Sequence, residues 1–137
     1  MMSRSNTSLC NKCDENQDQT ALHMFYQCQS IRPLFMWLLR ISYNVCNFKS
    51  GSNIRFLYFD TVYDNSHQKS ICNIFLYIYI LTIWKTRKEN IRIDILKTMI
   101  VKSILEYFDF IKLLPNTKLD KLFQEISRLN INDLIHV

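Results

Sequence analysis

The sequence predicts an all-α protein, and its glycine and proline content is the main reason. The 137-residue chain has a single glycine, Gly51, whereas hairpin-rich barrels and sandwiches need glycine at many tight turns. The 63 residues between Gly51 and Pro115 contain neither glycine nor proline, which is unusual outside long helices. Apolar residues make up 48% of the chain, enough to fill one core. We expect a single domain over residues 1–137, with a small N-terminal unit (9–30) followed by a helical bundle (31–137).

Three cysteines and one histidine in the N-terminal unit have the spacing of a zinc site. Cys10, Cys13, His23 and Cys28 follow the pattern C-x2-C-x9-H-x4-C. Zinc prefers four tetrahedral sulfur or nitrogen ligands, and two thiolates separated by two residues can bind one ion from a single turn. Three of the five cysteines fall within these 19 residues, so we favour a Zn²⁺ site over unrelated buried thiols and a surface histidine. Residues 9–30 are therefore expected to form a CCHC zinc knuckle.

The spacing of the last two ligands predicts where a helix ends. His23 and Cys28 are five residues apart, which places them about 140° apart on an ideal α-helix. Both can face one ion only if the helix ends before Cys28. We therefore expect a short helix over residues 19–27 that contains His23, with Cys28 in the following turn and the next helix beginning at Ser30.

The middle of the chain predicts one amphipathic helix and an irregular connection. A helix over residues 33–46 is indicated by four apolar residues on one face. They are Leu34, Trp37, Leu38 and Ile41. Residues 47–65 lack a periodic pattern, and we expect three of their apolar side chains to pack against the core. These are Phe56, Leu57 and Phe59.

Residues 66–90 contain the most apolar stretch of the chain. The run 71–84 is rich in Ile, Tyr and Phe, which by propensity also suits a β-strand. Its length without a turn residue favours a helix buried on most sides, capped by Asp64 or Ser66. The longest apolar run, 74–84, has eleven residues, whereas a bilayer-spanning helix needs about 20, so we expect no membrane span.

The C-terminal part predicts two further helices. Over residues 93–114, apolar residues recur every three or four positions and polar residues fill the opposite face. The apolar set is Leu96, Ile100, Ile104, Phe108, Ile111 and Leu114. Pro115 ends this helix, and Thr117 offers an N-cap oxygen for a last one. Its apolar stripe is Leu119, Leu122, Phe123, Ile126 and Leu129.

The positive charge of the chain is concentrated in its middle part. The net charge is +5, and residues 30–92 have nine basic and three acidic side chains. Such an excess permits a polyanionic partner. The candidate phosphate contacts near the knuckle are Arg32, Arg40 and Arg55, and a second group comprises Lys85 and Arg87.

Trp84 lies beside the second basic group, and two interpretations are open for it. Lys85, Arg87, Lys88 and Arg92 could contact a phosphate backbone while Trp84 stacks on a base. The alternative is that Trp84 belongs to the core and the charges solvate the end of a buried helix. We favour this alternative for Trp84 and expect the phosphate contacts nearer the knuckle.

The composition argues against an enzyme and against secretion. A P-loop, a dinucleotide-binding turn and a serine nucleophile elbow each need two or three glycines, and the chain has one. Four protein ligands leave no open position on the zinc for hydrolysis. The first twenty residues are polar and the cysteine count is odd, so we expect an intracellular protein of the cytoplasm or nucleus.

Residues 9–40, LCNKCDENQDQTALHMFYQCQSIRPLFMWLLR, resemble the zinc-binding domain that follows the polymerase of non-LTR (LINE-type) retrotransposon reverse transcriptases. That family shows Cys-x2-Cys, His-x-Phe, a further Cys and then an aromatic-rich helix. The matching residues are Cys10, Cys13, Thr20, His23, Phe25, Cys28, Arg32 and Trp37. A looser similarity covers IWKTRKENI, where the family often has Trp-Lys-x-Arg-Asn and this chain has Lys88 in place of the Asn.

The resemblance implies a non-catalytic zinc-binding accessory module that helps bind template RNA or DNA. It also implies the polymerase portion of a retroelement protein as a partner. The chain contains no Tyr-x-Asp-Asp motif and no polymerase domain, so we expect no enzymatic activity. The alternative is a zinc-stapled helical structural or protein-interaction domain without nucleic-acid affinity. Salt-sensitive binding of RNA or DNA distinguishes the two.

Overall fold

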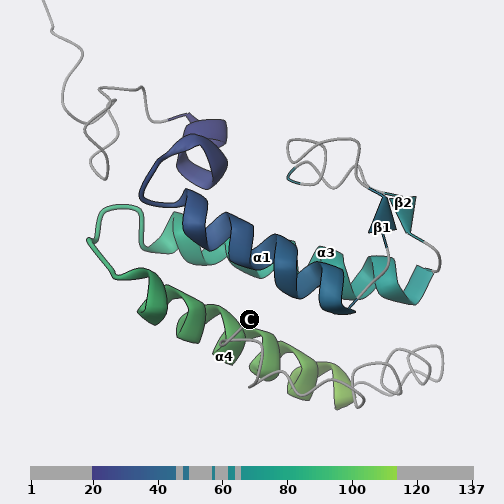
Figure 1. The fold of residues 1–137 in the computed structure, drawn as a ribbon. Coiled ribbons are helices and arrows are strands. Elements are labelled where there is room, and N and C mark those ends of the chain that lie inside the picture. Colours follow the sequence, from purple (N-terminus) through teal and green to yellow (C-terminus); the bar gives the residue numbers. More distant parts are fainter. Residues whose placement is uncertain (1–19, 46–47, 50–56, 58–61, 64–65, 114–137) are drawn as a thin grey trace, which may run out of the picture.

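A computed structural model of the chain describes residues 20–45, 48–49, 57, 62–63 and 66–113 (Figure 1). Its elements, in order, are η1 (His23–Gln27), α1 (Arg32–Val45), β1 (Phe48–Lys49), β2 (Val62–Tyr63), α3 (Ser66–Lys85) and α4 (Ile93–Lys112). Apart from one pair of two-residue strands, the described chain is helical and irregular, as predicted for an all-α fold. The zinc-knuckle residues before Thr20 lie outside the described part.

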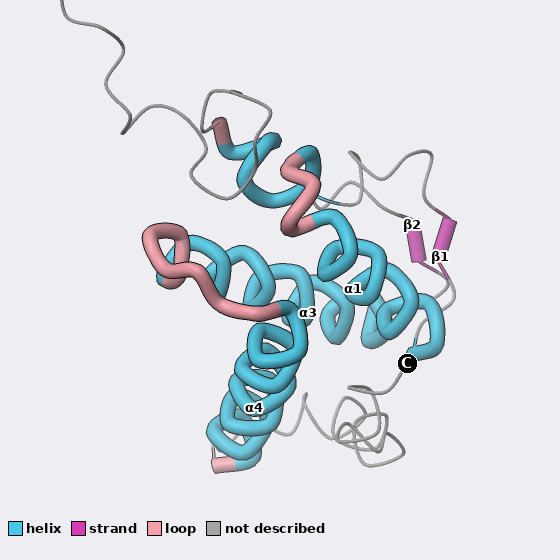
Figure 2. The backbone as a smooth tube through the Cα atoms, turned by 60° about the vertical axis from the view of Figure 1, so that its left-hand side comes forward, coloured by secondary structure: helices cyan, strands magenta, loops and turns pink. Residues whose placement is uncertain are grey.

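The three long helices pack around one core. Helices α1 and α3 run side by side in opposite directions, and α4 packs against both (Figures 1 and 2). Element η1 lies at the end of the α1–α3 pair where α1 begins and α3 ends. Strands β1 and β2 lie near the other end, where α1 ends and α3 begins. The antiparallel course of α1 and α3 therefore brings η1 close to the C-terminal end of α3.

Helix α1 begins at Arg32, immediately before Pro33. The fixed φ of proline suits the first turn of a helix, where its missing N–H costs no hydrogen bond. The predicted apolar face is buried as expected, since Leu34, Trp37, Leu38 and Ile41 are all 0% exposed. Phe35, which the predicted face did not include, is equally buried and contacts a second helix, because its ring meets that of Tyr79 edge-on at 5.9 Å.

Helix α3 is the central element, since it packs against η1, α1, α4 and β2. The helical interpretation of this apolar stretch is correct, since the helix runs over Ser66–Lys85. Two buried threonines satisfy their hydroxyls within the helix. Thr82 donates to the Ile78 carbonyl and Thr86 to the Thr82 carbonyl, each at 2.8 Å. The helix is not buried all round, because Tyr77 is 53% exposed. No helix in the described part of the chain has the length and apolarity to cross a membrane.

Helix α4 buries the predicted stripe against the other two helices. The stripe residues within the described chain, Leu96, Ile100, Ile104, Phe108 and Ile111, are all buried. Phe108 meets Phe75 of α3 with ring centroids 6.4 Å apart, and Lys97 Nζ lies 5.7 Å from the Trp37 ring centroid of α1. The helix ends at Lys112, two residues before the predicted limit. The final helix predicted after Pro115 lies outside the described residues.

The segment expected to be irregular contains a short strand pair that the sequence did not predict. Strands β1 and β2 pair antiparallel, with Phe48 opposite Tyr63. Two-residue strands have no detectable period, which explains why the pattern missed them. Leu57 is buried at 4% exposure, as predicted, whereas Phe56 and Phe59 fall outside the described residues.

Candidate functional site

Two of the four predicted zinc ligands lie in the described chain, one helical turn apart. In η1 the helix widens to a π-helix, and the Cys28 N–H donates to the His23 carbonyl at 2.8 Å. This i→i+5 bond closes a turn between residues that an α-helix would place about 140° apart. The wider turn therefore joins His23 and Cys28 through the backbone and reduces the angle between them that an α-helix would impose.

The helix also ends where predicted. Cys28 has extended backbone angles, φ −62° and ψ 127°, and so stops the helix directly after Gln27. At the other end, the Thr20 hydroxyl oxygen accepts a hydrogen bond from the His23 N–H at 3.1 Å. This is the arrangement of an N-cap, in which a side-chain oxygen three residues upstream satisfies a first-turn amide. Thr20 and Cys28 thus mark the two ends of this turn.

Both candidate ligands are buried, and η1 is fastened to the bundle beside them. His23 is 2% exposed and Cys28 is 1% exposed. The Tyr79 hydroxyl of α3 donates to the Phe25 carbonyl of η1 at 2.6 Å, which joins segments 54 residues apart in sequence. These contacts hold the two donor groups against the core rather than in solvent.

Contacts between aromatic rings make a second connection between η1 and the helices. The Tyr26 ring meets Phe35 of α1 edge-on at 5.0 Å. Phe35 in turn meets Tyr79 of α3, so three elements share one aromatic cluster. Edge-to-face pairs of this kind stabilise a fold by about 0.5–1.5 kcal/mol beyond the area they bury.

Tyr79 stays protonated in this position. Burial raises the pKa of its hydroxyl well above the ordinary value of 10.0, and the negative charge of the Cys28 thiolate raises this pKa further. Tyr79 therefore remains a hydrogen-bond donor to Phe25 at any pH near neutrality.

His23 and Cys28 carry donor groups of the kind that zinc binds. A neutral imidazole and a thiolate are ligand types that zinc prefers, and a turn of backbone holds both in place. Cys10 and Cys13, the other two predicted ligands, lie outside the described residues. Within the described part of the chain, no three His, Cys, Asp or Glu side chains gather as a metal site.

The three basic residues predicted near the knuckle are in different situations. The Arg32 guanidinium donates to the Gln27 carbonyl at 3.1 Å and lies 6.0 Å from the Tyr26 ring centroid. It therefore caps the C-terminal end of η1 while remaining exposed. Arg40 is exposed on α1, about 12 Å further along the helix axis. Arg55 lies outside the described residues.

The expectation that Trp84 belongs to the core is wrong, since its side chain is 49% exposed. Trp84 follows the buried Ile83 in the last turn of α3, about 100° further round the helix. The Arg87 guanidinium lies 3.9 Å from the Trp84 ring centroid, and its terminal nitrogen donates to the Trp84 carbonyl at 2.7 Å. The helix has apolar residues on every face. Periodicity therefore could not show which of its large residues would be exposed.

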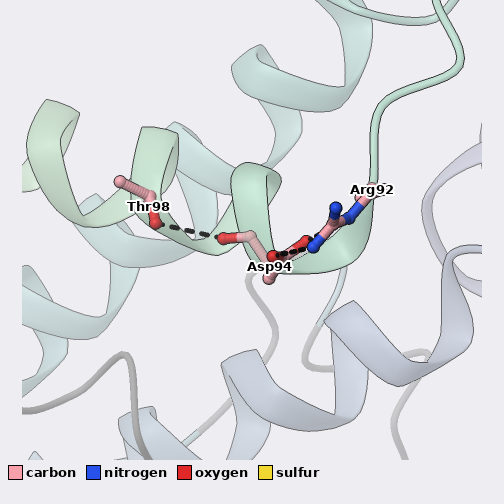
Figure 3. A network of polar contacts seen from close by, with 3 residues as sticks. All are labelled: Arg92, Asp94 and Thr98. Carbon is pink, nitrogen blue, oxygen red and sulfur yellow. Dashed lines mark hydrogen bonds and ion pairs between the residues drawn. The ribbon is translucent and has the colours of Figure 1, made fainter.

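The other basic residues of this turn differ in whether their charged groups are free to contact a phosphate. Lys85 and Lys88 are exposed. Arg92 is already paired, because its guanidinium donates to both Asp94 carboxylate oxygens at 3.1 and 2.6 Å, while the Thr98 hydroxyl donates to the Asp94 carbonyl (Figure 3). The hydrogen bonds from Arg92 lower the pKa of the Asp94 carboxyl. Arg92 is therefore the least suitable of these residues for a phosphate contact.

Four of the basic residues come to one end of the bundle, which we call the basic end. They are Arg32, Lys85, Arg87 and Lys88. Arg32 stands at the start of α1 and the others at the finish of α3, and η1 lies at this same end (Figure 1). His23 and Cys28, the two predicted ligands that the structure describes, thus lie in the element at this basic end. No protein family, curated protein or solved structure matches this chain, so its function has to be inferred from its own residues.

Proposed function

We propose that this chain is a non-catalytic zinc-binding module that binds single-stranded nucleic acid, similar to the accessory domain that follows a retroelement polymerase. The observation that supports this most is the position of η1. It holds His23 and Cys28 buried and one turn apart, at the end of the bundle where the basic residues gather.

Zinc has a structural role in this proposal. Cys10, Cys13, His23 and Cys28 would hold the ion and so connect the N-terminal residues to η1. Three thiolates and a neutral imidazole around Zn²⁺ leave a net charge of −1, which Arg32 at the end of η1 helps to offset. With four protein ligands the metal has no open position, so the proposed activity is binding and not hydrolysis.

The nucleic acid would lie across the basic end. Lys85 and Lys88 are exposed there, and Arg32 keeps an exposed guanidinium beside η1. Such contacts to phosphate are independent of sequence and strongly dependent on salt. The partners are then template RNA or DNA and, by the resemblance of residues 9–40, the polymerase portion of a retroelement protein.

Salt-dependent binding of a single-stranded oligonucleotide tests the proposal. If about four basic side chains contact phosphates, log affinity falls with log salt at a slope near −3. Replacing Lys85 and Lys88 with Gln removes two contacts and should flatten that slope by about 1.4. The control is Lys69→Gln with Lys102→Gln, which removes the same charge from exposed positions away from the basic end. Equal loss in both double variants, or no binding by the unaltered chain at low salt, contradicts the proposal.

The Arg32→Gln variant does not test phosphate binding alone. Its guanidinium donates to the Gln27 carbonyl, so Arg32→Gln also removes a cap from η1. Arg40→Gln on the exposed side of α1 avoids this difficulty and tests whether the binding surface extends along that helix. A lost phosphate contact there should flatten the salt slope by about 0.7.

A protein-interaction domain is the second candidate, and the outer side of α4 favours it. Tyr107, Phe110 and Leu113 are 41%, 59% and 80% exposed, and consecutive turns bring them near one another. Exposed apolar groups that lie close together mark many protein contact sites. This candidate predicts association with a protein partner and no salt-dependent affinity for oligonucleotides.

A further inference from the structure

We propose that Trp84 and Arg87 form a stacking platform for one unpaired base of a single-stranded nucleic acid. The inference rests on the proposed function and adds to it the place where a base binds. The two residues stand at the C-terminal end of α3, within the basic end. The interpretation that the sequence did not favour for Trp84 is thus the one that its exposure supports.

The first observation is that Trp84 is exposed, whereas other large aromatic residues are buried in the core. The chain's other tryptophan, Trp37, is 0% exposed, whereas Trp84 is 49% exposed. The Arg87 guanidinium lies over the indole, 3.9 Å from the ring centroid, so a base can stack only on the part of the ring that Arg87 leaves open. That surface is flat, aromatic and open to solvent, as base stacking requires.

The second observation is that the indole is braced in place. Arg87 stacks on it at 3.9 Å and is itself fixed by the 2.7 Å hydrogen bond to the Trp84 carbonyl. The turn beneath is closed by backbone hydrogen bonds, from Arg87 N–H to the Trp84 carbonyl and from Glu89 N–H to the Thr86 carbonyl at 2.9 Å. A base that stacks here therefore orders little that is not already ordered, which favours affinity.

The third observation is the charge around the ring. Lys85, Arg87 and Lys88 supply three cations within four residues, and Glu89 is the acidic residue of the same turn. Lys85 and Lys88 are exposed and can contact the phosphates on either side of a stacked base. A protein partner could also use an exposed tryptophan, but this density of positive charge favours a polyanion.

The ligand is single-stranded because of the geometry of stacking. In a duplex both faces of each base are covered by neighbouring bases, and a surface tryptophan cannot reach them. An unpaired base has a free face that can stack on the indole, with the Arg87 cation on the opposite side of the ring. Stacking does not depend on the identity of the base, so the platform would bind many sequences.

Comparison of a normal and an abasic oligonucleotide tests the platform directly. The two probes are an oligothymidylate of about ten nucleotides, within the usual site size, and an abasic strand with the same number of phosphates. The unaltered chain should bind the oligothymidylate about 5- to 150-fold more tightly than the abasic strand. Trp84→Leu should bind both equally, with unchanged affinity for the abasic strand, whereas Trp84→Phe should keep part of the preference. Only variants whose circular dichroism spectrum matches that of the unaltered chain are compared.

The outcomes separate this inference from the proposed function. If the unaltered chain binds both probes equally and with a steep salt dependence, the phosphate contacts stand and the stacking platform is refuted. The platform is also refuted if Trp84→Leu keeps the full preference for bases. If the unaltered chain binds neither probe at low salt, both proposals fall together.

Discussion

Most of the buried polar side chains described below have a hydrogen-bond partner in the core. The hydroxyls of Thr82 and Thr86 donate to carbonyls of their own helix, and the Cys72 thiol of α3 donates to the Ser42 carbonyl of α1 at 3.7 Å. The Ser42 hydroxyl differs, because it is buried without a hydrogen-bond partner among the described residues. A desolvated hydroxyl of this kind costs stability.

Ser42→Ala is therefore expected to stabilise the protein. The change removes the buried hydroxyl and improves helix propensity, so the free energy of unfolding should rise by about 1 kcal/mol. Urea denaturation measures this directly. The control is Ser103→Ala, at a half-buried position of α4, which should gain only the propensity part, about 0.5 kcal/mol. A less stable Ser42→Ala protein would show that the hydroxyl has a favourable partner.

Asp94 should titrate below its ordinary pKa of 3.8, because Arg92 donates hydrogen bonds to its carboxylate. The pKa is lowered in the folded state, so the stabilising contribution is present above the unfolded pKa and is lost as pH falls through the folded value. The contribution is small, since both side chains are well exposed. A carboxyl-detected NMR titration should show the lowered pKa, and Arg92→Gln should raise it toward the ordinary value. An unshifted pKa in the unaltered protein would mean that the pair does not persist in solution.

At the scale of elements, the sequence predicted the long helices well and the short irregular features poorly. The period of buried residues such as Leu96 and Ile104, together with Pro33, located α1 and α4 to within a few residues. The π-turn of η1 could not be predicted, because one i→i+5 bond leaves no periodic signature in five residues. The exposure of Trp84 could not be predicted either, because the residues before it in α3 are apolar on every face of the helix.

The cap on η1 makes a prediction at this scale. Thr20→Val removes the oxygen that accepts the His23 N–H, with nearly the same side-chain volume. Loss of such a cap should lower the free energy of unfolding by about 1 kcal/mol and weaken zinc affinity, because the turn that presents His23 is less well formed. Urea denaturation and a competitive zinc titration measure the two effects. Thr20→Ser keeps the oxygen and should behave like the unaltered protein; equal losses in both variants would rule out the cap as the cause.

At the scale of the whole molecule, the antiparallel pairing of α1 and α3 brings two separate sequence features to one end. His23 and Trp84 belong to η1 and α3, and the hydrogen bond from Tyr79 to Phe25 joins these elements directly. The sequence identified the ligand spacing and the basic segments but could not place them relative to one another, since this depends on packing across the core. The proposed zinc site and the proposed nucleic-acid surface thus share one end of the bundle.

The zinc content of the purified chain tests the central claim most directly. Elemental analysis of protein purified under reducing conditions should find one zinc ion per chain. Cys28→Ser, or Cys10→Ser with Cys13→Ser, should abolish this stoichiometric zinc, because each removes ligands from a site that needs four. Cys72→Ser makes the same chemical change at a buried cysteine outside the ligand set, and it should keep the full zinc content. A folded, metal-free unaltered protein, or a Cys28→Ser protein that retains one zinc ion per chain, would contradict the claim.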